Sequence, residues 1–192
     1  SRILAARSGV GRAFARQDRD FRLAYGAINE DDNDIDGVTM DTLVRGARRF
    51  EGTDRNDFFD FLYEHPIPQQ GTPTRRALQD AGDYYERSDN GNPWNEDPGS
   101  NSGEDIECRQ AYTILTTDGF WNGDNPGVGN TDGTDGSLIP NPFGYDYTYE
   151  AGDPYEDDES DTLADVAMDY WRRDLRTDLE NSVKPLEEDP AF

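Results

Sequence analysis

An apolar run that ends abruptly in Thr-Asp-Gly is the part of this sequence with the clearest chemical potential. Residues 108–123 read CRQAYTILTTDGFWNG, which predicts a buried strand over 111–117 with Asp118 at its end. In open α/β sheets, ligands bind just beyond the carboxyl ends of the strands. Asp118 is therefore the first candidate ligand residue, and a hard cation is the partner that suits its carboxylate.

Thr72 is the second candidate, because Gly71-Thr72-Pro73 lies at the predicted start of a helix. A hydroxyl and a carboxylate on neighbouring loops are hard oxygen ligands suited to Mg²⁺, Mn²⁺ or Ca²⁺. Each signal also has a structural explanation, since Gly-Thr-Pro commonly caps a helix and Thr-Asp-Gly commonly forms a turn. On spacing alone, those structural explanations are favoured over a shared metal site.

A third candidate is the acidic stretch of residues 32–37, DNDIDG, which matches the opening of a calcium-binding loop. The twelfth position of that loop is Leu43 rather than Glu, and the preceding residues predict a strand rather than a helix, which argues against an EF-hand. Asp32, Asp34 and Asp36 remain candidates for a weak calcium loop, although a chance match is favoured in so acidic a chain. The run 132–136, DGTDG, is similarly unspecific.

Enzymatic chemistry finds little support in the sequence. His65 is the sole histidine and lies between Glu64 and Pro66 at a predicted helix end, where a capping or surface role is favoured over a catalytic base. Neither a Gly-x-Ser-x-Gly elbow nor zinc-spaced Cys and His residues are present. The late tyrosines allow either sugar binding or packing of a long insertion, and packing is favoured: Tyr145, Tyr147, Tyr149 and Tyr155.

Composition narrows the function further. The chain has 192 residues and a formal charge of −24, with 42 acidic residues against 18 basic ones. Such a surface repels nucleic acid, so we expect no nucleic-acid partner. An acidic coat keeps a protein soluble and is typical of marine or salt-loving sources. No apolar run reaches the length of a membrane span. Cys108 permits no internal disulfide, and burial is favoured over pairing with a cysteine outside this chain.

Helical and strand patterns alternate along the chain and predict a layered α/β domain. We expect helices over 1–19, from about 53 to 63, from Pro73 onward and over 163–175, strands over 21–28, 44–50 and 111–117, and an acidic turn over 29–37. The regions of about 88–107 and 119–161 are too long for simple connections, so they are interpreted as insertions that serve a surface.

This order of elements resembles the von Willebrand factor A-like domain in the N-terminal part of the PilY/PilC family of type IV pilus biogenesis and tip proteins. The resemblance covers nearly the whole chain. Its most specific parts are the Cys-Arg-Gln before the strand that ends in Thr-Asp-Gly, and the segment LADVAMDYWRRDLR at 163–176. It implies one domain over 1–192, a doubly wound sheet with helices on both faces and long inserted loops.

The resemblance also implies a metal-ion-dependent adhesion site. In A domains this site takes ligands from an Asp-x-Ser-x-Ser loop after the first strand, a threonine from a second loop and an aspartate from a third. Thr72 matches the second element and Asp118 the third, whereas the first element has no match in this chain. The expected first strand must then come from an upstream segment or another chain. Occupancy by a divalent cation depends on that missing loop.

The expected function is a non-enzymatic component of type IV pilus assembly and tip-mediated adhesion on the bacterial surface. By analogy, an acidic group of a pilus-tip protein, a minor pilin or a host or surface ligand completes the coordination shell of the cation. The loop residues that would shape this ligand face are Phe120, Trp121 and Asn122. The main alternative is a metal-independent structural domain of a pilus tip or priming complex. An extracellular hydrolase is the least favoured alternative, because no base or nucleophile is evident.

Overall fold

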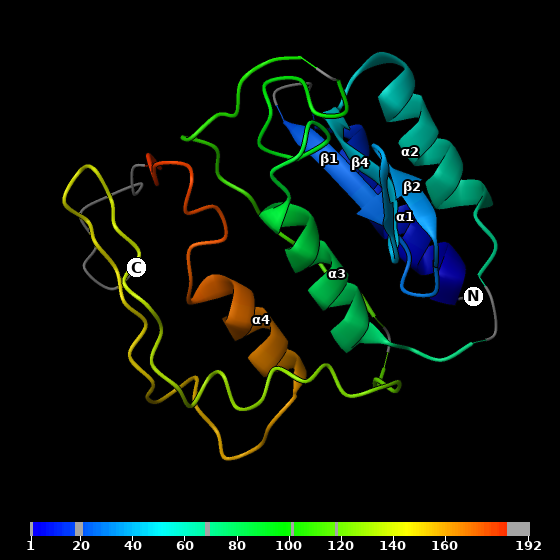
Figure 1. Ribbon diagram of the computed structural model, residues 1–192. Helices are drawn as coiled ribbons and strands as arrows, with labels where there is room; N and C mark the ends of the chain where they lie inside the picture. Colours follow the sequence, from blue (N-terminus) through cyan, green and yellow to red (C-terminus); the bar gives the residue numbers. More distant parts are fainter. Residues whose placement is uncertain (1, 18–20, 68–69, 101, 118, 184–192) are drawn as a thin grey trace.

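The computed structural model describes residues 2–17, 21–67, 70–100, 102–117 and 119–183. Its centre is an antiparallel pair of strands, β1 (Arg22–Gly26) and β4 (Leu43–Arg49), between helices (Figure 1). Helices α1 (Arg2–Ala15) and α2 (Gly52–Glu64) pack together, and α3 (Thr74–Glu86) lies on the other side of the strands from α2. The last helix, α4 (Leu163–Trp171), packs against α3.

An aromatic cluster joins α1 and α2 to the β1–β4 strand pair. The rings of Phe14 and Phe58 lie 5.0 Å apart, and those of Phe21 and Phe50 lie 4.9 Å apart. Tyr25 adds an edge contact to Phe58 at 5.5 Å. Aromatic pairs at these separations contribute attraction beyond the area that they bury. The α2 pattern of paired aromatic residues therefore reflects packing against the strands.

A second apolar cluster links the strands to α3. Its buried members are Ile35, Leu43, Ala47 and Tyr84. The Tyr84 hydroxyl accepts a hydrogen bond from the backbone N–H of Ala47 at 2.6 Å, so the helix supplies a partner to a buried strand group. Burial raises the pKa of Tyr84 to about 12, because the phenolate form would lose its hydration.

A short hairpin occupies the stretch for which the sequence predicted an acidic turn. Strands β2 (Asn33–Ile35) and β3 (Val38–Met40) pair antiparallel around Asp36 and Gly37. These two residues have φ values of 56° and 86°, as a type I′ hairpin turn requires. The acidic segment is thus part of a second, two-stranded sheet.

The predicted buried strand over 111–117 is wrong. Those residues form neither a helix nor a strand, and the side chains of Tyr112 and Ile114 are 76% and 82% exposed. The physical reason is the lack of a pairing partner, since β1 and β4 pair with each other in the described part of the chain. Both sheets there are two-stranded and antiparallel, so these residues do not form the expected doubly wound sheet, whereas the α/β class is confirmed.

The helix predictions agree more closely with the structure. Each expected helix is present, and Thr162 is the N-cap of α4. That last helix ends at Trp171, short of the predicted residue 175. In the described part of the chain, we find no helix with the length and apolar content needed to cross a membrane.

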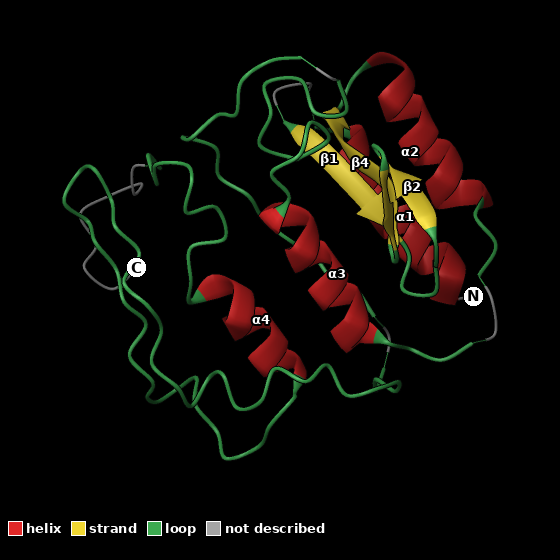
Figure 2. Cartoon of the chain, viewed as in Figure 1, coloured by secondary structure: helices red, strands yellow, loops and turns green. Residues whose placement is uncertain are grey.

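The long insertion over 119–161 contains no helix or strand in its described residues and packs on α4 (Figure 2). Tyr147 and Tyr149 place their ring edges against Trp171, with centroids 5.2 and 5.9 Å away. Tyr149 is buried and donates its hydroxyl to the carbonyl of Asp132. The packing explanation of the late tyrosines is therefore confirmed for these two residues.

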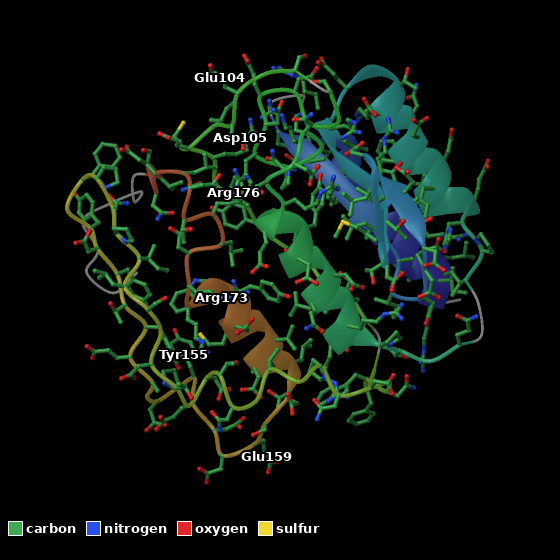
Figure 3. All side chains as sticks on the ribbon, viewed as in Figure 1. Glu104, Asp105, Tyr155, Glu159, Arg173 and Arg176 are labelled. Carbon is green, nitrogen blue, oxygen red and sulfur yellow. The ribbon has the colours of Figure 1, made fainter. Side chains whose placement is uncertain are left out.

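The other insertion, residues 88–107, is held from the C-terminal side by a buried arginine. Arg176 donates to the Asp105 carboxylate at 2.7 Å and to the carbonyl of Arg87 at 2.8 Å. Figure 3 labels Arg176 and Asp105. Arg176 also pairs with Asp178 at 2.8 Å. The hydrogen bonds to Asp178 and Asp105 raise the pKa of Arg176, so this clamp stays charged.

Candidate functional site

Thr72 and the loop after residue 118 lie side by side, although about 50 residues separate them in the sequence. The Thr72 N–H donates to the side-chain oxygen of Asn122 at 2.7 Å, and the Asn122 N–H donates to the Thr72 carbonyl at 3.0 Å. This reciprocal pair fixes the register of the two loops. The described residues of the Gly-Thr-Pro loop and of the loop that follows Thr-Asp-Gly are thus neighbours, and the shared site of Thr72 and Asp118 stays a prediction.

Two further side chains strengthen the same junction. Asn29 donates to the carbonyl of Gly71 at 2.9 Å, which ties the β1 end of the sheet to the loop. Arg75, in the first turn of α3, donates to the carbonyls of Gly123 at 3.0 Å and Asp124 at 3.1 Å. A side chain at position 71 would collide with Asn122, because an added Cβ would lie 2.4 Å from its amide oxygen. The glycine is therefore needed for close approach.

Sequence reasoning missed both Asn29 and Arg75 as site-building residues. Each side chain binds backbone carbonyls. Because every residue has a carbonyl, the sequence does not show which residue such a side chain will contact. Arg75 also donates to the carbonyl of Asp161 at 2.8 Å, which brings the start of α4 to the same junction. The signal that could have been used is a basic residue in the first turn of a helix, where the macrodipole does not favour it.

The metal prediction depends on Asp118, which lies outside the described residues. The Thr72 hydroxyl makes no hydrogen bond to another described residue, so its oxygen is available as a ligand. Among the residues described, no group of three or more histidine, cysteine, aspartate or glutamate side chains could hold a metal ion. A complete cation shell would therefore need Asp118 and at least one group that this part of the chain does not supply.

The predicted ligand-face residues divide into two roles. Phe120 is 94% exposed and Trp121 is 45% exposed, so both present aromatic surface to solvent beside the Thr72 loop. Asn122 instead uses its backbone N–H and its side-chain oxygen to latch the two loops together. Asn122 therefore contributes to a ligand face by holding the two loops in place.

The acidic stretch at 32–37 is used inside the fold. The Asp36 carboxylate pairs with Arg48 of β4, and Asp34 accepts the N–H of Gly37 at 2.9 Å within the hairpin turn. The backbone N–H of Asp32 donates to Asp41. These contacts explain the carboxylates of Asp34 and Asp36 without a cation, and the calcium loop proposed for Asp32, Asp34 and Asp36 stays a prediction.

The structure also shows the surroundings of two other candidates from the sequence, His65 and Cys108. The His65 ring packs against Phe61 in a tilted arrangement with ring centroids 4.5 Å apart, and its Nε2 lies 3.3 Å from a Glu30 carboxylate oxygen. This is a packing and pairing role at the end of α2. Cys108 is exposed, so the expectation of a buried cysteine is wrong.

A buried carboxylate pair underlies the insertion on α4. Asp165 accepts the N–H groups of Thr131 at 2.8 Å, Asp132 at 3.3 Å and Thr162 at 2.8 Å. Desolvation raises the pKa of the neighbouring Asp132, and the charges of Asp165 and Asp157 add to that rise. The run at 132–136 is thus a structural anchor that the sequence showed only as an unspecific acidic motif.

Comparison with known proteins identifies relatives along almost the entire chain. It is 34% identical over 185 residues to the type IV pilus biogenesis factor PilY1 of Pseudomonas aeruginosa strain PAK, which is 96% of this chain and 15% of that protein. The PAO1 strain's PilY1 is 32% identical over 188 residues, covering 96% of this chain and 16% of the relative. That of strain UCBPP-PA14 is 31% identical, covering 97% and 15% respectively. No family model and no solved structure matches the chain.

Proposed function

Because this chain is related to a segment of PilY1 over nearly its whole length, we propose that it acts in type IV pilus biogenesis as a non-enzymatic binding module. The chain spans about 15% of the length of these relatives, so the proposal concerns one segment of such a factor. The observation that carries the pilus role is the similarity along 96% of the chain. The proposed place of action is the outside of a bacterial cell, at the pilus tip.

The proposed binding site is the junction of the Thr72 and Asn122 loops. The reciprocal hydrogen bonds between these loops support it, because they bring the residues that follow Asp118 beside Thr72. In this proposal Thr72 and Asp118 supply oxygen ligands to a divalent cation, Mg²⁺, Mn²⁺ or Ca²⁺. When bound, such an ion supplies an open coordination position for an acidic group of an adhesion ligand or a pilus protein.

The fold proposed for this module is a von Willebrand factor A-like domain completed by a strand from another segment. The largely exposed residues 111–117 support this proposal, because they belong to neither sheet of the described structure. An unpaired apolar segment of this kind readily accepts a neighbouring strand. The added strand would bury Tyr112 or Ile114 and support the loop that contains Asp118.

A metal-independent structural domain in a pilus tip or priming complex is the second candidate. It is favoured by the absence of any cluster of three metal-binding side chains among the described residues. The loop junction is also held by side-chain contacts to backbone, which need no ion. An extracellular hydrolase has least support, because His65 is occupied by Phe61 and Glu30.

Calorimetric titration of Mg²⁺, Mn²⁺ and Ca²⁺ separates the two main candidates. We expect saturable heats in the unmodified protein, loss of those heats in Asp118→Ala and weaker binding in Thr72→Ala. Asp60→Ala is the matched control, since Asp60 is exposed on α2, away from the junction. Equal heats in the Asp118 and Asp60 variants would contradict the metal site and leave the structural candidate.

The pilus role needs a separate experiment in cells. Deletion of the region that encodes this segment should reduce the number of surface pili, counted by electron microscopy, and reintroduction of the segment should restore them. An unchanged pilus count in the deletion strain would overturn the proposed role, whatever the result of the metal titration.

A further inference from the structure

Three arginines converge at one end of the β1–β4 strand pair. Arg22 of β1 and Arg49 of β4 are direct cross-strand partners, so their side chains leave the same face as neighbours. Arg109 approaches from the segment after the 88–107 insertion and donates to the carbonyls of Pro93 at 2.7 Å and Asn95 at 3.0 Å. We name Arg22, Arg49 and Arg109 the arginine cluster.

The loop at 93–96 brings the members of the cluster together. Arg22 donates to the carbonyl of Glu96, the residue that follows the Asn95 carbonyl bound by Arg109. Two guanidinium groups from distant parts of the chain thus hold adjacent backbone positions. Arg49 lies opposite Arg22 in the strand register and has an exposed side chain. Its guanidinium donates no hydrogen bond to another described residue.

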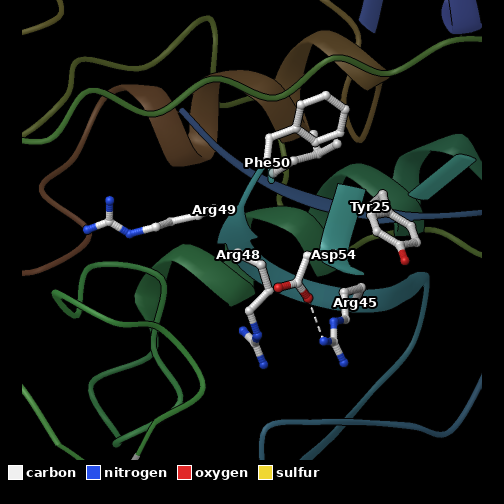
Figure 4. Close-up of a pocket in the computed structure, with 7 residues that line it drawn as sticks. Tyr25, Arg45, Arg48, Arg49, Phe50 and Asp54 are labelled. Atoms are coloured by element: carbon white, nitrogen blue, oxygen red, sulfur yellow. Dashed lines mark hydrogen bonds and ion pairs between the residues drawn. The ribbon is translucent and has the colours of Figure 1, made fainter. Parts of the chain in front are cut away.

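This concentration of positive charge is unusual in a chain with a formal charge of −24. Most buried or half-buried arginines of the protein have a carboxylate partner, as Arg45 has in Asp54 and Arg48 has in Asp36. Within the described residues, no member of the arginine cluster is paired with a carboxylate. Figure 4 shows Arg49 extending away from the Arg45–Asp54 pair.

The positive charges of the cluster lower one another's pKa values. Burial lowers the pKa of Arg109 to about 10, and the positive charge of Arg22 contributes to the lowering. Burial also lowers the pKa of Arg22, with Arg49 as the next cause. One terminal nitrogen of Arg109, Nη2, is enclosed without a hydrogen-bond partner in the described structure. Like charges opposite each other on a strand pair are destabilising. The charges of Glu96 and Asp97 near Arg22, and of Asp105 near Arg109, offset only part of the lowering of these pKa values.

Anchoring of the 93–96 loop explains only part of this arrangement. It accounts for Arg22 and Arg109, which bind the loop carbonyls. It does not account for Arg49, whose guanidinium makes no hydrogen bond to the described residues of that loop and adds repulsion to both neighbours. An external anion would use the exposed guanidinium of Arg49 and relieve that repulsion.

We propose that Arg22, Arg49 and Arg109 form a binding site for the carboxylate groups of an acidic segment of a partner protein. Guanidinium groups bind carboxylates through paired, charge-assisted hydrogen bonds, so the chemistry of the cluster suits this ligand. A nucleic acid is disfavoured as the occupant, because its dense phosphates would be repelled by a chain with a formal charge of −24. A short acidic segment carries fewer negative charges than a nucleic acid, so it is repelled less as it approaches the arginine cluster.

Fluorescence anisotropy with a fluorescein-labelled hexaglutamate peptide tests the site directly, at low ionic strength and with hexaglutamine as the neutral probe. We expect saturable binding of hexaglutamate alone, weakened at least fivefold by Arg49→Gln and by Arg109→Gln. Arg12→Gln is the matched control, because Arg12 is exposed on α1 and the change removes the same charge. Its affinity should stay within twofold of the unmodified protein.

Several outcomes would overturn the proposal. They are the absence of saturable hexaglutamate binding, equal weakening by the Arg12 and Arg49 substitutions, or tighter binding of a labelled DNA duplex than of the peptide. Competition by inorganic phosphate would support it, because phosphate offers the same oxyanion chemistry to the guanidinium groups.

Thermal unfolding of the Arg49→Gln variant without peptide gives a second measurement. Removing the repulsion between Arg49 and Arg22 should leave the melting temperature unchanged or raise it by about 1–3 °C at low ionic strength. A fall in melting temperature would show that Arg49 stabilises the fold and would contradict a ligand-binding role for its charge.

Discussion

Replacing Asp165 should loosen the long insertion from the body of the protein. The Asp165 side chain is fully buried in the first turn of α4, and its two oxygens accept the backbone N–H groups of Thr131, Asp132 and Thr162. The Thr162 hydroxyl accepts the N–H of Asp165 in return, which completes a capping box. One carboxylate thus starts the helix and holds the insertion.

The expected cost follows from these hydrogen bonds. A hydrogen bond to a charged group contributes about 1.5–3 kcal/mol, and a buried donor left without a partner costs about 1–3 kcal/mol. Asp165→Asn keeps one acceptor oxygen but turns an amide N–H toward another donor. We therefore expect a loss of about 3 kcal/mol in the free energy of unfolding. For a protein of this length that corresponds to a fall of roughly 6–12 °C in melting temperature.

Urea denaturation followed by circular dichroism measures the loss, and chymotrypsin cleavage of the tyrosine-rich insertion shows where it occurs. Asp169→Asn is the matched control, because Asp169 lies one turn further along α4 and forms partly exposed ion pairs with Arg172 and Arg173. Such pairs contribute about 0–1 kcal/mol. Equal stability and equal cleavage rates in the two variants would refute the anchoring role of Asp165.

Three further predictions concern the strand core and the loop junction. Tyr84→Phe removes the acceptor of the buried Ala47 N–H, so the free energy of unfolding should fall by about 1–3 kcal/mol in urea denaturation; an unchanged midpoint would contradict this. Because the pKa of Tyr84 is raised to about 12 in the fold, the unfolded chain loses this proton first. Stability should therefore fall between about pH 10 and 12, and more steeply in the unmodified protein than in the Tyr84→Phe variant; parallel pH profiles of the two proteins would count against this linkage. Asn122→Ala should speed amide hydrogen exchange at Thr72 at least tenfold, whereas Phe120→Ala should leave it unchanged; equal rates would exclude the latch.

Helices were predictable from this sequence because their signals are local. Apolar residues at helical spacing mark the buried side of α3, and Thr162 marks the start of α4 with a capping residue. The β2–β3 hairpin was missed although Asp36-Gly37 is a strong hairpin signal, because the surrounding acidic residues also fit a cation loop. Local chemistry alone does not decide between a turn and a ligand site.

The loop junction was predictable only in outline. The order of elements indicated that the loops of Thr72 and Asp118 are neighbours, and the Thr72–Asn122 hydrogen bonds agree for the residues described. The contacts from Asn29 and Arg75 were not predictable, because they bind carbonyls whose positions depend on the finished fold. The arginine cluster was missed for a similar reason, since its members are 27 and 60 residues apart along the chain.

Residues 111–117 show why an apolar pattern is not enough to specify a strand. Alternating apolar side chains favour the extended backbone, but a strand is stabilised by hydrogen bonds and cross-strand contacts from a partner. Here the Tyr85 hydroxyl donates to the carbonyl of Tyr112 at 3.1 Å and holds the segment near α3 without supplying a ladder. Burying an isoleucine such as Ile114 contributes about 1.5–3 kcal/mol, which would offset part of the entropy lost when a strand is ordered. Because Asp118 follows this segment directly, we infer that completing the sheet and orienting the candidate ligand are one coupled event.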